Sequence, residues 1–313
     1  MLLQADMAKV AIMGCGRWGS NHLKTLAKLR EEGLVENITV IDPSLEARQK
    51  ATLADITKAD LEGLDADLVI IATPPKHHSQ QAKDLISKGF HVLVEKPLGC
   101  SEIEAAEVVS YSQEYGKIVS VGLLLRFHPI APLAKHYIDS GLLGRVESIR
   151  FVRRTKRPQP ANGNVIESLG VHGIDLACYL MSETEPTCIN VQGDRMEAEI
   201  AVEFPHGIEA LIDVCWGASK ERRFVEVNGS ISSLKFYLDV HNEVVLVKNG
   251  KEEKKLIENN MSPLECELRH VISCVKAHQE GANWSVIPDQ GAALRGVRLT
   301  EIAMQKLPMS WPH

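Results

Sequence analysis

The sequence predicts an α/β protein with an N-terminal doubly wound parallel sheet and a C-terminal α+β domain whose sheet is large, open and mostly antiparallel. The chain has 313 residues, more than one hydrophobic core comfortably holds. Apolar runs alternate with helical patterns in the first third, and strand patterns follow one another after about residue 122. We therefore expect a first domain at 7–122 and a second at 123–313, allowing for a C-terminal segment that packs back on the first.

In the first domain, short continuous apolar runs are typical of strands buried on both faces of a parallel sheet. We expect these strands at 9–13, 38–42, 67–73, 91–95 and 118–122. Amphipathic spacing predicts helices at 18–30, 78–88 and 101–115. Ser101, with Glu104 three residues later, has the pattern of a capping box at the start of the last helix.

In the second domain, alternating patterns separated by turn signals such as Asn228-Gly229 indicate strands of an antiparallel sheet. The expected strands are 146–153, 187–192, 198–204, 208–215, 224–227, 234–238 and 244–247. One helix, at 165–180, interrupts them, and two more, at 263–279 and 291–305, close the chain.

Composition excludes several classes of protein. A net charge of −6 disfavours a general nucleic-acid surface. The seven scattered cysteines include no Cys-x-x-Cys pair, so we expect neither a disulfide framework nor a metal site. No apolar run approaches the ~20 residues that cross a bilayer. Residues 1–7 contain no basic and apolar regions of signal-peptide length. We expect a cytoplasmic protein without membrane or nucleic-acid partners.

The turn after the first predicted strand reads Gly14-Cys15-Gly16-Arg17-Trp18-Gly19. In a strand–turn–helix context, Gly14 permits the tight turn, Gly16 lets the backbone approach a pyrophosphate, and Gly19 allows close packing of helix and strand. The helix N-terminus offers N–H groups to the phosphates. Asp42, at the end of the next strand, can accept hydrogen bonds from ribose hydroxyls and repel a 2′-phosphate, which favours NAD over NADP. The alternative is a glycine-rich turn with a capping aspartate.

A second signal is the Glu95-Lys96-Pro97 turn, which ends the strand at 91–95. Ligands of open α/β sheets bind outside the carboxyl ends of the strands. Pro97 stiffens the turn and disfavours a helical conformation at Lys96. Lys96 is therefore expected to point toward the ligand, and the alternative is a surface lysine on an ordinary turn.

Together the motifs resemble the Gfo/Idh/MocA oxidoreductases. They are Gly14–Gly19, Thr73-Pro74-Pro75 with His78, Glu95-Lys96-Pro97, Gly122-x-x-x-Arg126-Phe127-x-Pro129 and Gly170-Val171-His172-Gly173-Ile174-Asp175. The resemblance implies NAD(P)-dependent oxidation of a sugar hydroxyl, or the reverse reduction. The cofactor-binding residues it implies, together with those of the glycine turn, are Gly14, Gly16, Arg17, Trp18, Gly19, Asp42, Thr73, Pro74, His78, Glu95, Lys96 and Arg126.

The resemblance also implies catalytic roles for Lys96, His172 and Asp175. Lys96 would hydrogen-bond the reacting oxygen, and a histidine, whose pKa lies near neutrality, suits removal of the hydroxyl proton. On an α-helix, His172 shares a face with Asp175 and Ser168. Ser168 stands where the family pattern has an aspartate, and Glu167 would lie on another face. The alternatives are a salt bridge for Asp175 and a satisfied interdomain histidine for His172.

The Trp18-Gly19-Ser20-Asn21 turn is similar to nucleotide-sugar members such as UDP-N-acetylglucosamine 3-dehydrogenases. Arg153 and Arg154 would bind the diphosphate, because arginine forks suit phosphate oxygens. The expected substrate-binding residues are Lys96, Arg153, Arg154, Ser168 and His172. The alternative for the basic run is a solvated edge strand. Leu123, Leu125 and His128 depart from that subgroup's pattern.

Two other functions remain open from the sequence. One is a polyol, inositol or aldose dehydrogenase or reductase on the same fold, including one that reduces an inosose or a 1,5-anhydro-ketose. The other is an NAD-sensing regulatory protein without turnover. An open antiparallel sheet needs one face covered, and the family usually covers it with another subunit's sheet. Alternation such as Ala198-Ile200-Val202 permits this, so we expect a homodimer or homotetramer.

Overall fold

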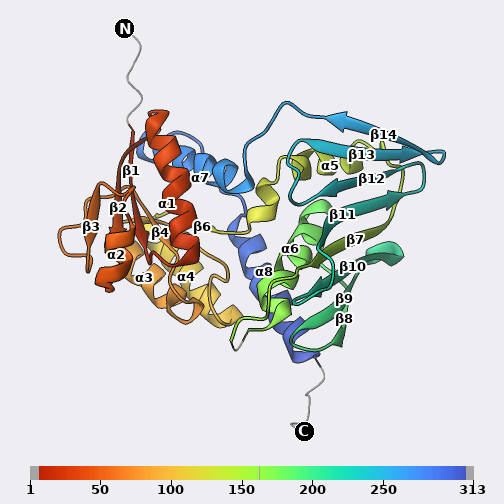
Figure 1. Ribbon diagram of the computed structural model, residues 1–313, viewed down its shortest axis with the longest axis horizontal. Helices are drawn as coiled ribbons and strands as arrows, with labels where there is room; N and C mark the ends of the chain where they lie inside the picture. Colours follow the sequence, from red (N-terminus) through yellow and green to blue (C-terminus); the bar gives the residue numbers. More distant parts are fainter. Residues whose placement is uncertain (1–6, 162, 308–313) are drawn as a thin grey trace. The chain divides into compact units, whose positions relative to one another are not determined.

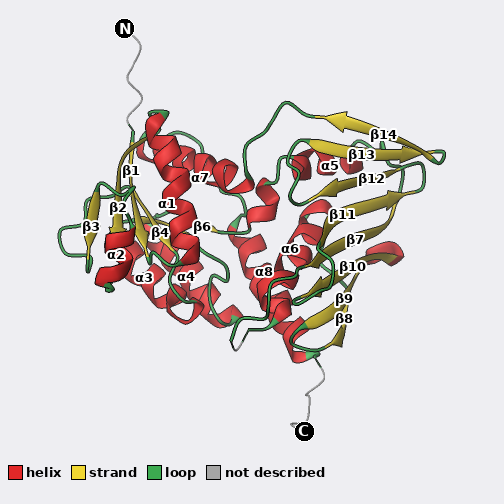
Figure 2. Cartoon of the chain, viewed as in Figure 1, coloured by secondary structure: helices red, strands yellow, loops and turns green. Residues whose placement is uncertain are grey.

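A computed structural model describes residues 7–161 and 163–307 (Figure 1). Apart from residue 7, the expectation about residues 1–7 falls outside the described chain. Helices and strands alternate in the first part, and strands dominate the middle (Figure 2). The chain divides into two compact units. The first runs to Leu123 and includes Leu264–Val297, whereas the second comprises Leu124–Pro263 and the chain from Arg298 onward.

The first unit is built on the parallel sheet that the sequence predicts. Its strands lie in the order β3-β2-β1-β4-β5-β6, and every pairing is parallel. Every residue of β4 and β5 is buried, which accounts for their unbroken apolar runs. The strands are β1 (Ala8–Met13), β2 (Val35–Ile41), β3 (Ile56–Lys58), β4 (Leu68–Ile71), β5 (His91–Val94) and β6 (Val119–Val121).

Helix α4 begins where its capping box predicts. The Ser101 hydroxyl accepts a hydrogen bond from the Glu104 N–H, and the Glu104 carboxylate accepts one from the Cys100 N–H. The sequence analysis missed α2 and β3 because both are too short to show a period. The helices are α1 (Arg17–Glu31), α2 (Leu45–Lys50), the 3-10 turn η1 (Pro75–His77), α3 (His78–Ser87), α4 (Glu102–Tyr115) and α7 (Pro263–Gln279).

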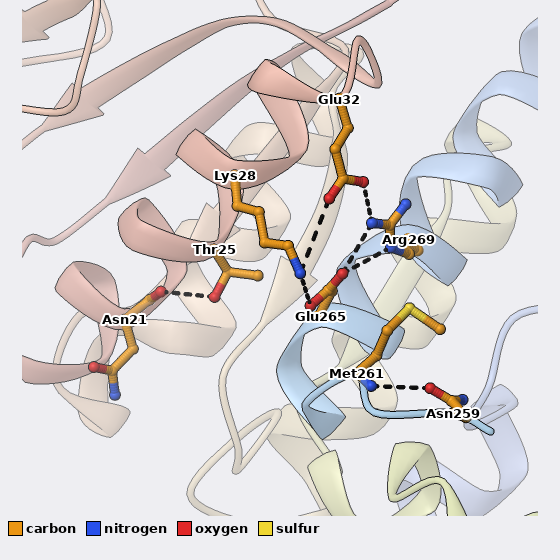
Figure 3. A network of polar contacts seen from close by, with 8 residues as sticks. All are labelled: Asn21, Thr25, Lys28, Glu32, Asn259, Met261, Glu265 and Arg269. Carbon is orange, nitrogen blue, oxygen red and sulfur yellow. Dashed lines mark hydrogen bonds and ion pairs between the residues drawn. The ribbon is translucent and has the colours of Figure 1, made fainter. Parts of the chain in front are cut away.

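Helix α7 joins this unit from far along the chain and is tied to α1 by charges (Figure 3). The Lys28 ammonium lies 2.7 Å from the Glu265 carboxylate. Arg269 pairs with Glu265 at 2.9 Å and also with Glu32. Glu265 is buried, whereas Lys28, Glu32 and Arg269 are partly exposed, so the cluster fixes the register of α7 against α1.

The second unit is built on a mostly antiparallel sheet in the order β14-β13-β12-β11-β7-β10-β9-β8. The β7–β10 pair is parallel, so the sheet is mixed. The sequence analysis missed β14 because its lysines and glutamates give no apolar alternation, as is common for edge strands. The strands are β7 (Val146–Arg154), β8 (Cys188–Gly193), β9 (Glu197–Phe204), β10 (Ile208–Cys215), β11 (Arg222–Gly229), β12 (Ser233–Tyr237), β13 (Glu243–Lys248) and β14 (Lys251–Leu256).

Helix α6 packs on one face of this sheet at close range. A Cβ added at Gly173 would lie 2.7 Å from Ile212 and Phe151, so only glycine fits there. Ala198, Ile200 and Val202, whose alternation permitted a covering subunit, face this core. The helical elements of the unit are the 3-10 turn η2 (Leu124–Phe127), α5 (Ile130–Asp139), η3 (Ile166–Gly170), α6 (Val171–Leu180), the 3-10 turn η4 (Pro205–Gly207) and α8 (Gln290–Gln305), of which α8 spans both units.

Candidate active site

A cavity of about 860 Å³ opens at the carboxyl edge of the parallel sheet, where β1, β2 and β4 end. This is the edge at which ligands bind to open α/β sheets. Five of the predicted cofactor residues line it: Gly14, Gly16, Asp42, Thr73 and Pro74. The sequence analysis did not single out the other residues of the lining, namely Met13, Ile41, Pro43, Ala59, Asp60, Leu61, Ala72, His77, Gln81 and Lys88.

The three glycines of the turn have the different roles that the motif predicts. Gly14 has a φ of +90°, and a Cβ there would lie 2.9 Å from the Ala72 carbonyl oxygen. A Cβ at Gly19 would lie 1.9 Å from the Gly14 carbonyl oxygen, so helix and turn touch. A Cβ at Gly16 would meet nothing within 4 Å. The backbone is thus open at the start of α1, which fits a pyrophosphate.

Asp42 is held rigidly beside the same cavity. One carboxylate oxygen accepts the Cys15 N–H at 2.8 Å, and the other accepts the Ser44 N–H at 2.9 Å. Each oxygen keeps a lone pair for a further hydrogen bond, such as one from a ribose hydroxyl. Asp60 adds a second carboxyl to the lining. Two acids in the lining of the cavity fit NAD and disfavour a 2′-phosphate.

His78, predicted to contact the cofactor, bridges two loops and is 1% exposed. Its Nδ1 lies 2.8 Å from the Pro97 carbonyl oxygen and its Nε2 lies 2.8 Å from the Thr73 carbonyl oxygen. Thr73 in turn donates to the Gln81 side chain at 2.5 Å. His78 thus connects a loop that lines the cavity to the loop that contains Lys96.

The Glu95-Lys96-Pro97 turn follows β5, and its Lys96–Pro97 peptide bond is cis. The Glu95 carboxylate lies 2.8 Å from Nε2 of His22, a residue of α1 whose side chain is 1% exposed. The sequence analysis missed His22 because nothing in its spacing points across the sheet. Arg17 and Trp18 are the first two residues of α1, the helix that contains His22.

In the second unit, Asp175 and Arg126 form one buried ion pair. Arg126 donates from Nη2 and Nε to Asp175 at 2.6 and 2.9 Å, and from Nη1 to Glu183 at 2.7 Å. Burial opposes the charge, but the two carboxylates outweigh it and raise the pKa of Arg126. The pair ties α6 to η2, so its geometry favours the salt-bridge interpretation of Asp175. The cofactor contact expected of Arg126 stays a prediction.

His172 lies in the first turn of α6 and is 6% exposed. The segment before it, η3, is a π-helix, in which the Val171 N–H bonds to the Ile166 carbonyl. The sequence predicts a continuous α-helix at 165–180, and its first turn is therefore wrong. A π turn takes more residues than an α turn, so residues five apart are brought toward one face. Glu167 is five residues before His172, and Ser168 is four.

Arg153 and Arg154 are neighbours on β7, so their side chains leave opposite faces of the sheet. Arg154 lies 2.6 Å from each of two carboxylates, those of Glu197 and Asp213. The prediction that both arginines bind one diphosphate is untested. The alternation indicates that a single phosphate site would use only one of them.

Among the described residues, no group of three or more histidine, cysteine, aspartate or glutamate side chains could hold a metal ion. Within the same residues, no helix is both long and apolar enough to span a membrane.

Family models match both parts of the chain. Residues 8–123 match the GFO/IDH/MocA oxidoreductase family with its NAD-binding Rossmann fold, and residues 133–235 match the GFO/IDH/MocA C-terminal domain. The protein is thus an oxidoreductase with an NAD-binding Rossmann domain. It belongs to the GFO/IDH/MocA family, and the proteins similar to it include an inositol 2-dehydrogenase and a levoglucosan dehydrogenase.

Among characterised relatives, the rhizopine catabolism protein MocA of Rhizobium meliloti is 29% identical over 67% of this chain and 69% of its own length. Inositol 2-dehydrogenase 2 of Saccharopolyspora erythraea is 28% identical over 56% of this chain, and the match covers about half of that relative, 54%.

Two solved structures show the same fold. A levoglucosan dehydrogenase in complex with NADH and levoglucosan has a TM-score of 0.82 at 18% identity, covering 96% of this chain and 97% of that one. The UDP-N-acetylglucosamine 3-dehydrogenase GnnA of Acidithiobacillus ferrooxidans has a TM-score of 0.80 at 18% identity, covering 96% and 98%. At this identity the likeness concerns the fold alone.

Proposed function

We propose that this protein oxidises a secondary hydroxyl of an unphosphorylated polyol or sugar with NAD, or catalyses the reverse reduction. The observation that supports NAD is the cavity with two acids, Asp42 and Asp60, beside the open backbone of Gly16. The observation that favours an unphosphorylated substrate is Arg154, which two carboxylates already engage. Several relatives similar in sequence are inositol 2-dehydrogenases, which supports a cyclic polyol.

In this proposal, Lys96 donates a hydrogen bond to the reacting oxygen and stabilises its alkoxide character. His172 accepts the hydroxyl proton, as a neutral imidazole can at neutral pH. The bound nicotinamide would supply the hydride acceptor. His78 holds the Lys96 loop against the Thr73 loop, so that the lysine is presented from a fixed backbone.

A substrate panel tests the proposal. The protein is incubated with NAD and either myo-inositol, a pyranose sugar or UDP-N-acetylglucosamine, and NADH absorbance is followed. The expected result is turnover of an unphosphorylated member. Turnover of the nucleotide sugar alone would replace the proposal with the second candidate below, and no hydride transfer with any member would favour the NAD-sensing interpretation.

The role of Lys96 has its own test. Replacing it with methionine keeps the length of the side chain but removes the donor, so kcat should fall by about 10²–10³-fold. NADH affinity, measured by fluorescence, should stay within about threefold. The matched control is Lys24→Met on the exposed side of α1. A wild-type kcat in Lys96→Met would exclude a role for this lysine in the reaction.

The second candidate substrate is a nucleotide sugar such as UDP-N-acetylglucosamine, oxidised at C3. The Trp18-Gly19-Ser20-Asn21 pattern favours it, and in this alternative Arg153, on the face of β7 opposite to Arg154, is the expected diphosphate ligand. Under this alternative, Arg153→Met should raise the KM for the nucleotide sugar about tenfold and leave the KM for NAD unchanged.

A further inference from the structure

His22 of α1 is a fully buried histidine whose ring has one polar contact among the described residues. Its Nε2 lies 2.8 Å from a carboxylate oxygen of Glu95. Its Nδ1 has no hydrogen-bond partner within the described chain. Since a carboxylate only accepts hydrogen bonds, the imidazole donates from Nε2. The contact with Glu95 is therefore the polar interaction that a substitution at His22 removes.

Packing alone does not account for a histidine at this position. The other buried residues of α1 are small or apolar, namely Gly19, Leu23, Leu26, Ala27 and Leu29. An imidazole with one unpaired ring nitrogen is costly in such surroundings, where a leucine would be buried at no such cost. What the histidine adds is the hydrogen bond from α1 to Glu95 at the end of β5.

Glu95 is held from two other directions as well. Its backbone N–H donates to the Ile71 carbonyl at 2.9 Å, which continues the pairing of β4 with β5 into the Glu95-Lys96-Pro97 turn. A Cβ added at Gly122, just after β6, would lie 3.2 Å from the second carboxylate oxygen and 3.5 Å from Cα of Glu95. The close approach of this glycine leaves the carboxylate little room to turn away from His22.

The other end of the turn is anchored by a second buried histidine, His78. Its Nδ1 lies 2.8 Å from the Pro97 carbonyl oxygen. His78 begins α3, the helix between β4 and β5, whereas His22 belongs to α1, the helix between β1 and β2. These two crossovers run in opposite directions along the sheet, so right-handed connections place α1 and α3 on opposite faces. Lys96 therefore lies between two residues that are anchored from the two faces of the sheet.

We propose that His22 is a positioning residue. Through the Glu95 carboxylate it holds the turn at its first residue, as His78 holds it at its last, and so fixes the backbone from which Lys96 reaches the substrate. The same helix begins at the open backbone of Gly16, so one rigid element carries both the expected pyrophosphate site and this anchor. The part that concerns Lys96 rests on the proposed function.

Hydrogen exchange tests the anchor without any substrate. His22→Asn places its amide near the position of Nδ1, away from Glu95, so exchange of the backbone N–H groups at 96–100 should rise about tenfold. His22→Gln places its amide nitrogen near the position of Nε2 and should keep this exchange within about twofold of wild type. Equal exchange at 96–100 in the two variants would overturn the proposal.

The matched control is Leu26→Ala, one turn further along the buried face of α1. The smaller side chain leaves a cavity and should lower Tm, as His22→Asn also does. Because Leu26 has no contact with the turn in the proposal, exchange at 96–100 and kcat should stay within about twofold of wild type. An increase in exchange equal to that of His22→Asn would reduce the effect at His22 to a general loss of stability and contradict the anchor.

Kinetics test the effect on Lys96. His22→Asn should lower kcat about tenfold or more, because small displacements of a reacting group are costly, while the Kd for NADH stays within about threefold. His22→Gln should restore kcat to within about threefold of wild type. In the background Glu95→Ala, which already lacks the acceptor, His22→Asn should lower kcat by less than about twofold further. Additive losses in the double variant, or equal kcat in His22→Asn and His22→Gln, would contradict the role.

These outcomes separate the inference from the proposed function. If no panel member is turned over, the proposed function fails, while exchange at 96–100 still decides the anchor. If turnover is found and His22→Asn behaves as His22→Gln does, only the inference about His22 fails. Should His22→Asn not fold, Glu95→Ala takes its place, because it removes the same hydrogen bond from the more exposed partner. Wild-type exchange at 96–100 in Glu95→Ala would then overturn the proposal.

Discussion

Single carboxyl groups define much of the chemistry of this protein, and each has different surroundings. Asp42 accepts two backbone N–H groups beside the cofactor cavity. The carboxylate of Asp175 forms an ion pair with the buried Arg126. Glu267 has no hydrogen-bond donor among the described residues. In our proposal, the carboxyl group of Asp42 serves in cofactor choice, whereas that of Asp175 anchors a helix.

Cofactor choice is tested at Asp42 and Asp60. Asp42→Asn keeps an acceptor but removes the charge, so the affinity for NAD should fall about tenfold, and discrimination against NADP should shrink. Because Asp60 also lines the cavity, the double variant with Asp60→Asn should discriminate still less. Kd values for both cofactors, from fluorescence titration, provide the measurement. Undiminished preference for NAD in the double variant would contradict the assignment.

The buried ion pair is tested at Asp175. Asp175→Asn leaves Arg126 buried beside a neutral amide and should lower the free energy of unfolding by about 3 kcal/mol. Glu183→Gln, which removes the more exposed partner of the same arginine, should cost less than about 1 kcal/mol. Urea denaturation compares the two. Equal stabilities would argue for a chemical rather than an anchoring role for Asp175.

At the scale of elements, the π turn η3 bears on which side chain accompanies His172. An α-helix pairs His172 with Ser168, whereas a five-residue turn brings Glu167 toward it. π turns often occur at functional sites because they re-aim side chains without ending the helix. We therefore expect Glu167 to take the place of the aspartate that the family pattern has at Ser168.

The π turn predicts different effects for substitutions at the adjacent residues Glu167 and Ser168. Glu167→Gln should lower kcat by about tenfold or more and shift the acid limb of the pH profile, because a carboxylate stabilises the protonated histidine. Ser168→Ala, one residue away, should change kcat less than about threefold. If Ser168→Ala has the larger effect, the α-helical pairing applies.

At the scale of the whole molecule, each unit contains a buried histidine whose pKa is lowered. Desolvation, followed by the positive charges of His278 and Lys117, lowers the pKa of His91 to about 4 in the first unit. Desolvation, followed by the charge of His241, lowers the pKa of His128 to about 4 in the second. Both rings are therefore neutral at physiological pH.

These pKa values predict acid sensitivity. Between pH of about 6.5 and about 4, the unfolded chain binds protons that the folded chain does not, so stability is complete above this window and falls as the pH decreases through it. Each histidine should contribute up to about 3 kcal/mol. Thermal unfolding across this range should show the loss, and His91→Gln should flatten the curve. A pH-independent Tm between 4 and 6.5 would contradict the prediction.

The amino-acid sequence by itself determined the fold class, most elements and the glycine turn with Asp42, because periodicity, capping and turn chemistry act between near neighbours. Only the tertiary structure decided the partners of Asp175 and Arg154, the contacts of His78 with two loops and the burial of Glu267. These features depend on side chains that meet across long stretches of chain. The π turn before His172 could not be predicted from the sequence either. The apolar spacing there is that of an α-helix and does not reveal the extra residue in the turn. Local rules therefore predicted which residues occur at the candidate site, while packing determined what each of them contacts.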